Sequence, residues 1–286
     1  MKRNLLVPCD FSPESREAYQ FALQLASRTG GSVHVLKAVD LPVMYESALG
    51  AAPYYFDPTL IRELKDNARV QFDKLVAQYP SAVKVEFTVK EGPVTPTIRQ
   101  FIADHGIDLV VMGTRGASGL EEYLIGSNTE KVVRFSPVPV FAVRKSVPLE
   151  SIRNIVFPTT LESQPELMRE VKALQEFFGA RLHLVLVNTP YNLLRTDDEL
   201  ARMKSFAEQH QLSNYTLNTR DDFREPNAII NFANEMKADL IAMGTHGRRG
   251  LAHFFTGSIT ESVVNHMDGI IWTFSTHKSM ASPPDA

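Results

Sequence analysis

Two stretches of the chain carry glycines at the same spacing, each ending in a glycine followed by serine. The first is Gly113-Thr114-Arg115-Gly116 and, after nine residues, Gly126-Ser127. The second is Gly244-Thr245-His246-Gly247 and, after nine residues, Gly257-Ser258. Glycine allows a backbone to approach a ligand closely, and the N-terminus of a helix presents N–H groups and a positive dipole end to an anion. The pattern therefore predicts that the chain binds phosphate groups.

The elements around each glycine stretch are of the type that would position such a site. Each stretch follows an apolar run, 108–112 or 239–243, and precedes a segment that reads as helix. Every member of the second stretch lies 131 residues after its counterpart (244 − 113), and Gly119 and Gly250 keep this offset. The chain thus contains an internal repeat.

Apolar runs alternate with helical patterns along the first half. Ser12 reads as a helix N-cap followed by Pro13, and Gly30 reads as the stop of that helix. The expected strands are 5–7, 33–36, 83–89, 108–112 and 138–143, and the later helices are 61–78, 95–104 and 127–135. Strands that alternate with helices predict an α/β fold with a parallel sheet, helices on both faces, and ligands at the carboxyl ends of the strands.

The second half repeats this order with one difference in length. Asn154 to Phe157 matches Asn4 to Val7 at an offset of 150, and Leu182 to Leu184 matches Val33 to Val35 at 149. Because the glycine stretches are offset by only 131, the first half must carry about 18 additional residues. We place them in Leu41 to Pro58, which is rich in proline, tyrosine and small residues.

Composition narrows the class of protein. A chain of 286 residues is long enough for two domains. The net charge of −3 and the pI near 6.3 argue against binding to nucleic acid or to a membrane surface, because there is no basic excess. The single Cys9 excludes an internal disulfide, and no Cys/His cluster has metal-ligand spacing. The apolar run at the N-terminus is too short for a signal peptide or a membrane span. We therefore expect a cytoplasmic protein, and the lack of a ligand cluster leads us to expect no structural metal.

The glycine pattern, together with a first strand that ends Pro8-Cys9-Asp10-Phe11-Ser12, resembles the universal stress protein family in its ATP-binding subgroup. The resemblance covers residues 1–147 and 150–277 and leaves a tail, 278–286. It implies two tandem domains, each a five-stranded parallel sheet with helices on both faces, that bind ATP or a related nucleotide, with or without Mg2+. It also implies that the last strands, 138–143 and 269–274, pair the halves as an intramolecular pseudo-dimer, with a further homodimer left open.

The resemblance assigns roles to residues of the first half. Asp10 would accept hydrogen bonds from the nucleoside, Val39 would flank the base, and Met112 would bound the pocket. The residues that would contact ribose and phosphates are Gly113, Arg115, Gly116, Gly126, Ser127, Asn128 and Thr129.

The second half departs from the family pattern. Thr160 stands where Asp10 stands, and Asn188 replaces Val39. A hydrogen bond to a charged group contributes about 1.5–3 kcal/mol and a neutral one about 1, so the second site is expected to be roughly tenfold weaker or more. The residues of this weaker site that persist are Met243, Gly244, His246, Gly247, Gly257, Ser258 and Thr260.

Structural interpretations stand beside these assignments. The glycines could serve only as turns, Asp10 only as an acid at a helix start, and Arg115 only as a solvated cation. Tyr54 and its aromatic neighbours Tyr45, Tyr55 and Phe56 could form a lid or simply pack at the domain edge. Cys9 reads as a small buried apolar residue, and every histidine can be structural.

No enzyme signature is present. The chain lacks the P-loop, dinucleotide-binding and serine hydrolase motifs, and no residue stands out as catalytic. The sequence therefore favours a nucleotide-binding regulatory stress-response protein with at most slow ATP hydrolysis. The alternatives are an α/β enzyme that acts on an adenylated or phosphorylated small molecule, and a scaffold with a non-nucleotide ligand in its second half.

Overall fold

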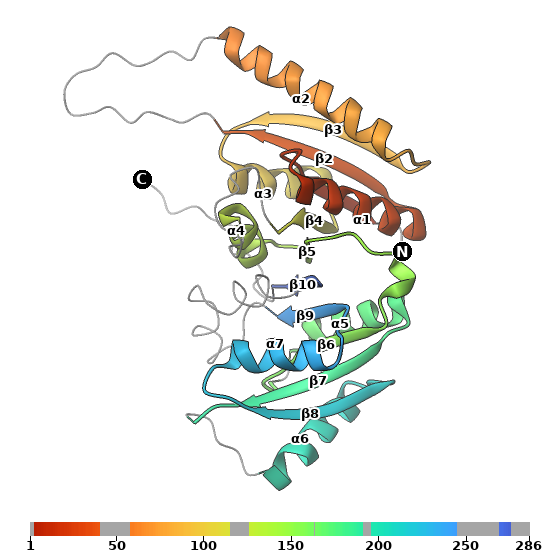
Figure 1. Ribbon diagram of the computed structural model, residues 1–286, viewed down its shortest axis with the longest axis vertical. Coiled ribbons are helices and arrows are strands. Elements are labelled where there is room, and N and C mark those ends of the chain that lie inside the picture. The colour runs from red at the N-terminus through yellow and green to blue at the C-terminus, as the bar shows by residue number, and fades with distance from the viewer. Residues whose placement is uncertain are drawn as a thin grey trace, which may run out of the picture.

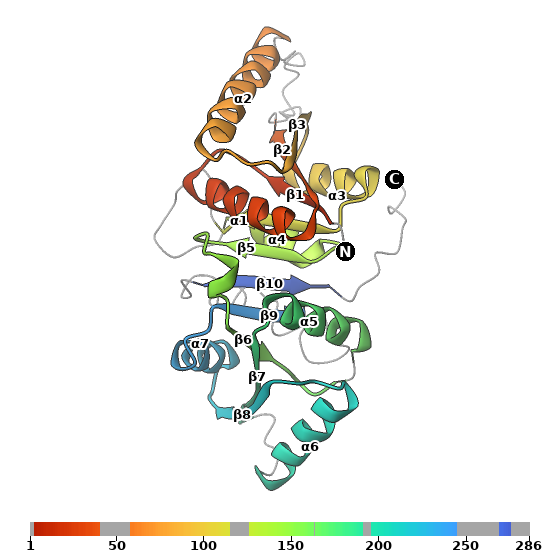
Figure 2. The same ribbon diagram turned by 90° about the vertical axis from the view of Figure 1, so that its right-hand side faces the viewer.

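The computed structural model of the chain describes residues 3–40, 58–114, 126–162, 164–190, 196–244 and 269–275. Its two halves lie one above the other along the longest axis, with β5 (Val140–Val143) and β10 (Ile270–Phe274) side by side between them (Figures 1 and 2). The short helix η1 (Leu149–Ser151) lies between the two repeats.

Both halves show the alternation of strands and helices that the sequence predicts. In the first half the elements are β1 (Asn4–Pro8), α1 (Pro13–Thr29), β2 (Ser32–Val39), α2 (Pro58–Gln78), β3 (Lys84–Glu91), α3 (Val94–His105), β4 (Leu109–Gly113), α4 (Ser127–Phe135) and β5. In the second half they are β6 (Asn154–Pro158), α5 (Pro165–Phe178), β7 (Arg181–Asn188), α6 (Thr196–Gln209), β8 (Tyr215–Asp221), α7 (Glu225–Glu235), β9 (Leu240–Gly244) and β10.

Local signals in the sequence set the start of α1 and the ends of both α1 and α5. The Ser12 hydroxyl caps α1 by accepting from the Ser15 N–H at 3.3 Å, and Pro13 occupies the first helical position. Gly30 ends α1 with a φ of 64°, and Gly179 ends α5 with a φ of 62°. Because L side chains rarely adopt this left-handed conformation, glycine is the residue these stops require.

The strands form one continuous sheet in the order β3-β2-β1-β4-β5-β10-β9-β6-β7-β8. Within each half every pairing is parallel, whereas β5 and β10 pair antiparallel. The predicted pairing of the two last strands is therefore confirmed, but the two five-stranded sheets are merged into one ten-stranded sheet. Each half hides an otherwise open sheet edge against the other, which removes two rows of unpaired backbone groups.

The register of the central pair reveals a pseudo-two-fold axis. Trp272 lies opposite Phe141, and the flanking pairs are Ile271 with Ala142 and Thr273 with Val140. Phe141 and Trp272 are 131 residues apart, the same offset as the glycine stretches. Equivalent residues of the two halves therefore meet at the junction. Pro139 lies directly before β5, outside the residues that pair with β10, and its carbonyl accepts from the Val110 N–H at 3.0 Å.

The two faces of the sheet carry separate hydrophobic cores. One core takes side chains from α1, α2, α5 and α6 and runs through both halves, and the other takes side chains from α3, α4 and α7. In the part of the chain that the structure describes, each helix is too short or too polar to cross a lipid bilayer. The site described next lies at the carboxyl ends of strands in the first half.

Candidate functional site

A cavity of about 270 Å³ lies where β1, β2 and β4 end and α4 begins. Of the residues that the sequence predicts for the first site, Asp10, Met112, Gly113, Gly126, Ser127, Asn128 and Thr129 line it. They come from segments more than 100 residues apart in the chain. The structure thus brings the acidic end of the first strand and the glycines of the fourth strand to one place.

Asp10 holds a sharp turn at the edge of this cavity. Its Oδ1 accepts hydrogen bonds from the Ser12 N–H at 3.0 Å and from the Ser12 hydroxyl at 2.6 Å. Between them, Phe11 adopts a φ of 66°, a conformation that bulky residues rarely take. Asp10 therefore supports the start of α1, as the structural interpretation expects, and the same side chain lines the cavity.

The beginning of α4 is fixed against the end of β4. The Gly126 N–H donates to the Thr114 carbonyl at 2.9 Å, and the buried Thr129 hydroxyl donates to the Gly113 carbonyl at 2.8 Å. The first N–H groups of an α-helix have no acceptor within the helix. Those of Ser127 and Asn128 lie at the end of α4 that borders the cavity, where they can meet an anion.

Close packing explains the glycine at position 113 independently of any ligand. A Cβ atom on Gly113 would lie 2.7 Å from the Glu14 carbonyl carbon and 2.9 Å from the Ser15 nitrogen. Because both are backbone atoms, a side chain here would push α1 away from β4. Gly113 is thus needed for packing, and its position at the cavity wall follows from that packing.

Several lining residues were missed by the sequence analysis. They are Pro8, Cys9, Ser15, Leu36, Lys37, Ala38, Val94 and Ile98. Lys37 is the notable one, because it brings a cation to the cavity, with Nζ 6.0 Å from the centroid of the Phe11 ring. A lysine two residues before the end of the strand was the available signal. Val39, the predicted neighbour of the base, does not line the cavity, and its carbonyl accepts from the Gly92 N–H at 3.0 Å.

Cys9 lies buried beside the cavity in its neutral form. Burial raises the pKa of its thiol, and the thiol donates to the Ser15 hydroxyl at 3.4 Å. A thiol held protonated is a poor nucleophile, since the thiolate is the reactive form. Cys9 therefore behaves as a small packing residue.

Part of each predicted site lies outside the described residues. In the first site these residues are Arg115 and Gly116, and in the second they are His246, Gly247, Gly257, Ser258 and Thr260. Residues 41–57, with the four aromatic residues named above, and the tail also lie outside them.

The first turn of the second half is built differently from that of the first. Leu161 repeats the left-handed conformation of Phe11, with a φ of 62°. Here, however, the Thr159 hydroxyl accepts from the Leu161 N–H at 3.0 Å, and Thr160 is exposed. The residue that replaces Asp10 is therefore turned to solvent, and its neighbour supports the turn.

Helix α5 meets the end of its strand with a side chain, where α1 meets Gly113 with backbone atoms. It begins at Pro165, two residues later than the offset of the first strands predicts, so Leu167 stands at the third position of the helix, where α1 has Ser15. A Cβ atom on Gly244 would lie 2.5 Å from the Leu167 Cδ2 atom, and the Gln164 Oε1 atom nearby is buried without a hydrogen-bond partner. An apolar side chain therefore occupies the end of β9.

Asn188 forms a buried polar cluster at the end of β7. Its Nδ2 donates to Glu199 Oε1 at 3.0 Å and to Asp221 Oδ1 at 3.1 Å. Glu199 is buried, and its Oε2 has no hydrogen-bond partner. Two carboxyl groups thus stand beside the position that an apolar valine holds in the first half.

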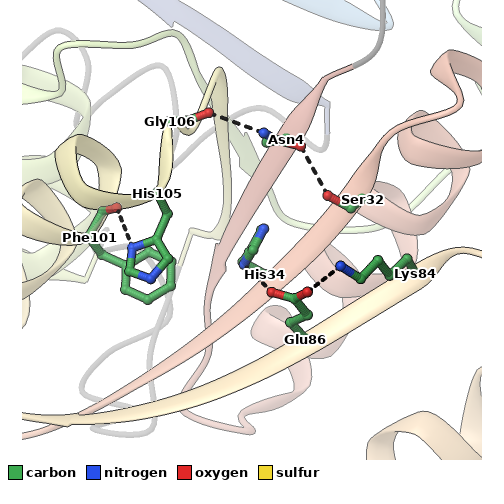
Figure 3. A network of polar contacts seen from close by, with 8 residues as sticks. All are labelled: Asn4, Ser32, His34, Lys84, Glu86, Phe101, His105 and Gly106. Atoms are coloured by element: carbon green, nitrogen blue, oxygen red, sulfur yellow. Dashed lines mark hydrogen bonds and ion pairs between the residues drawn. The ribbon is translucent and has the colours of Figure 1, made fainter.

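One histidine in each half contacts the neighbouring strand. His34 Nδ1 lies 3.3 Å from a carboxylate oxygen of Glu86, which Lys84 also contacts (Figure 3). On helix α3, the His105 ring stacks on Phe101 with 3.8 Å between ring centroids. His183, the equivalent of His34, contacts Thr216 at 2.8 Å and Asn154 at 3.2 Å. Burial lowers the pKa of both His34 and His183. Among the described residues, no three His, Cys, Asp or Glu side chains gather into a group that could hold a metal ion.

Comparisons with known proteins agree with the repeat. The sequence model described as the universal stress protein family matches residues 1–144 and 151–269. A universal stress protein of Synechocystis sp. is 22% identical over 95% of this chain and 99% of its own length. One of Methanocaldococcus jannaschii is 30% identical over 144 residues, which are 50% of this chain and 82% of the relative. The crystal structure of a universal stress protein from Archaeoglobus fulgidus has the same fold, with a TM-score of 0.72 over 96% of both chains at 20% identity.

Proposed function

The chain belongs to the universal stress protein family, and we propose that its first half binds an adenine nucleotide, with ATP as the expected ligand. On this proposal the protein is a nucleotide-dependent regulator in a stress response, working in the cytoplasm. The observation that carries the proposal is the cavity in which Asp10, the end of β4 and the start of α4 meet.

The chemistry of the cavity fits the parts of a nucleotide. Leu36, Ala38, Val94, Ile98 and Met112 offer an apolar wall to a base. The Asp10 carboxylate can accept hydrogen bonds from ribose hydroxyls, and such charged bonds are the stronger kind. The N–H groups at the start of α4 can meet phosphate oxygens, and Lys37 adds a positive charge. The volume of about 270 Å³ lies near the lower end for ligand pockets.

We propose that the second half binds nucleotide weakly or not at all. Thr160 is exposed, Leu167 packs on Gly244, and Asn188 with the carboxyl groups of Glu199 and Asp221 makes the end of β7 polar. One chain is therefore expected to bind about one nucleotide.

The repeat supplies a matched pair of variants for the test. Gly126→Val places a branched side chain at the phosphate end of the first site, and Gly257→Val makes the same change at the equivalent position of the second. We expect calorimetric titration with ATP to show loss of binding in a folded Gly126→Val protein and near wild-type affinity in Gly257→Val. Unchanged ATP affinity in folded Gly126→Val would refute the first site.

A second measurement identifies the ligand without assuming it. Native mass spectrometry of the freshly purified protein would report any small molecule that co-purifies. An adenine nucleotide at about one per chain supports the proposal, whereas a different metabolite would redirect it. ATP turnover measured on the same sample separates a binding protein from an ATPase.

A further inference from the structure

A second cavity, here called the interface cavity, lies between the two halves on the face of the sheet that carries α1 and α5. Its volume is about 280 Å³, and the residues that define it are Leu25, Thr29, Phe141, Leu174, Phe177 and Trp272. Leu25 and Leu174 are equivalent in the repeat, as are Phe141 and Trp272. The interface cavity is therefore at the pseudo-two-fold axis and is separate from the nucleotide cavity.

A difference in side-chain size between the halves accounts for this space. Thr29 is the last residue of α1, and Phe178 is the last residue of α5, directly before the equivalent glycines. Phe178 is buried, with its ring edge-on to Phe141 at 6.5 Å between centroids. On the other side of the axis the smaller Thr29 leaves room, and its hydroxyl donates to the Leu25 carbonyl at 2.9 Å.

Contacts between the halves hold one wall of the interface cavity in place. The Arg28 guanidinium lies 4.6 Å from the centroid of the Phe177 ring, and its Nη2 donates to the Phe177 carbonyl at 2.7 Å. Such a cation–π contact combined with a charged hydrogen bond fixes the ring that lines the cavity. The space is thus preformed, which lowers the entropic cost of binding a ligand.

One residue of each charge, Arg3 and Glu170, lines the interface cavity. Glu170 already contacts the Arg169 Nε at 3.6 Å, whereas Arg3 forms no ion pair with a described residue. We propose that the interface cavity binds a small amphiphilic carboxylate, with an apolar body of about ten carbon atoms against the aromatic walls and its carboxylate near Arg3.

The size of the ligand follows from the volume. An apolar cavity of about 150 Å³ binds benzene, so a space of about 280 Å³ has room for a larger apolar body. Long-chain lipids would exceed it. Decanoate is therefore a suitable probe, and decan-1-ol and decyltrimethylammonium have the same chain length without the negative charge.

Trp272 reports on the interface cavity directly, because it is the single tryptophan of the chain. We expect its fluorescence to change saturably when the full-length protein is titrated with decanoate below the micelle concentration. Arg3→Met should lower the affinity for decanoate at least about tenfold and leave the affinity for decan-1-ol within about twofold of the wild-type value. Because the nucleotide cavity is elsewhere, Gly126→Val should bind decanoate as the wild type does.

A pair of variants at one position tests the location. Thr29→Phe copies Phe178 and should fill the space and abolish the response, whereas Thr29→Val preserves the volume and should retain it. Circular dichroism verifies that both variants fold. If Thr29→Phe folds and still binds decanoate, or if decyltrimethylammonium binds as tightly as decanoate to the wild type, the proposal is wrong. Should Thr29→Phe fail to fold, the Arg3→Met comparison of decanoate with decan-1-ol decides alone.

Discussion

Phe141 and Trp272 stand opposite each other at the centre of the ten-stranded sheet, one from the last strand of each half. Both side chains are buried, and both belong to the core that runs through the two halves. The aromatic pair at the axis is thus a single structural element made by two distant parts of the chain. Its packing ties the stability of the two halves together.

The first prediction concerns this junction. Phe141→Ala should destabilise the protein by about 3–5 kcal/mol, because it removes a buried ring and leaves a cavity at the axis. The free energy of unfolding from urea titration measures the effect. Phe223→Ala serves as the control: Phe223 is 84% exposed, so its removal should change stability by less than about 0.5 kcal/mol. Equal effects of the two changes would contradict the importance of the junction.

The second prediction concerns the charge at Asp10. Asp10→Asn keeps an oxygen that can accept from Ser12 but removes the negative charge from the cavity. ATP affinity should fall about tenfold or more, while the thermal unfolding midpoint changes little. Calorimetry and differential scanning fluorimetry on the same samples separate the two effects. An affinity that survives the change would reduce Asp10 to its role in the turn.

The third prediction concerns the weaker second half. Thr160→Asp alone should restore little nucleotide binding in the second half, because Leu167 still occupies the end of β9. Combined with Leu167→Ser, which copies Ser15, it should raise the calorimetric stoichiometry above one nucleotide per chain. A wild-type protein with two equal tight sites would show that the inferred asymmetry is not real.

The fourth prediction concerns pH and His183. Burial lowers the pKa of His183 in the folded protein, so below the ordinary histidine pKa the unfolded chain binds more protons. This histidine therefore makes the protein less stable as the pH falls from about 7 toward 5. In His183→Asn the unfolding midpoint should depend less steeply on pH across that interval. The exposed-surface change Lys204→Gln should leave the slope as it is.

The fifth prediction concerns Glu225, which should change the pH dependence of stability in the opposite direction to His183. Burial raises the pKa of Glu225 to about 7, so the folded protein holds a proton that the unfolded chain loses. Glu225 therefore costs stability as the pH rises from about 4.5 through 7. Glu225→Gln should stabilise the protein at pH 8 by about 1 kcal/mol, a figure reduced because the side chain is only partly buried, and should have little effect at pH 4.5. A gain of equal size at both pH values would rule out ionisation as the cause.

The sequence predicted the order of the elements well, because the glycines and apolar runs occur twice at constant offsets. Helix α4, for example, begins and ends at the predicted residues, Ser127 and Phe135. The start of α5 could not be predicted in the same way. The segment before Pro165 is two residues longer than its counterpart before Pro13. Only the packing of Leu167 on Gly244 shows where the helix must begin.

The side chains that line the cavity of the first half were harder to predict than the positions of the strand ends. At the end of β2, Leu36, Lys37 and Ala38 line the cavity, and Val39 does not. The Val39 carbonyl instead accepts from the Gly92 N–H, a contact between distant parts of the chain that the sequence does not reveal. The assignments of Arg115 and His246 stay predictions, as do the domain boundaries, the cytoplasmic location and the enzyme and scaffold alternatives.

Joining the two halves in one chain gives them a freedom that two identical subunits lack. In a symmetric dimer every substitution appears on both sides of the axis, so a phenylalanine at the position of Thr29 would fill both sides at once. Here Thr29 faces one side and Phe178 the other. In the same way Leu167 blocks one strand end without touching the other. Covalent linkage thus allows the residues on one side of the axis to differ from their counterparts on the other.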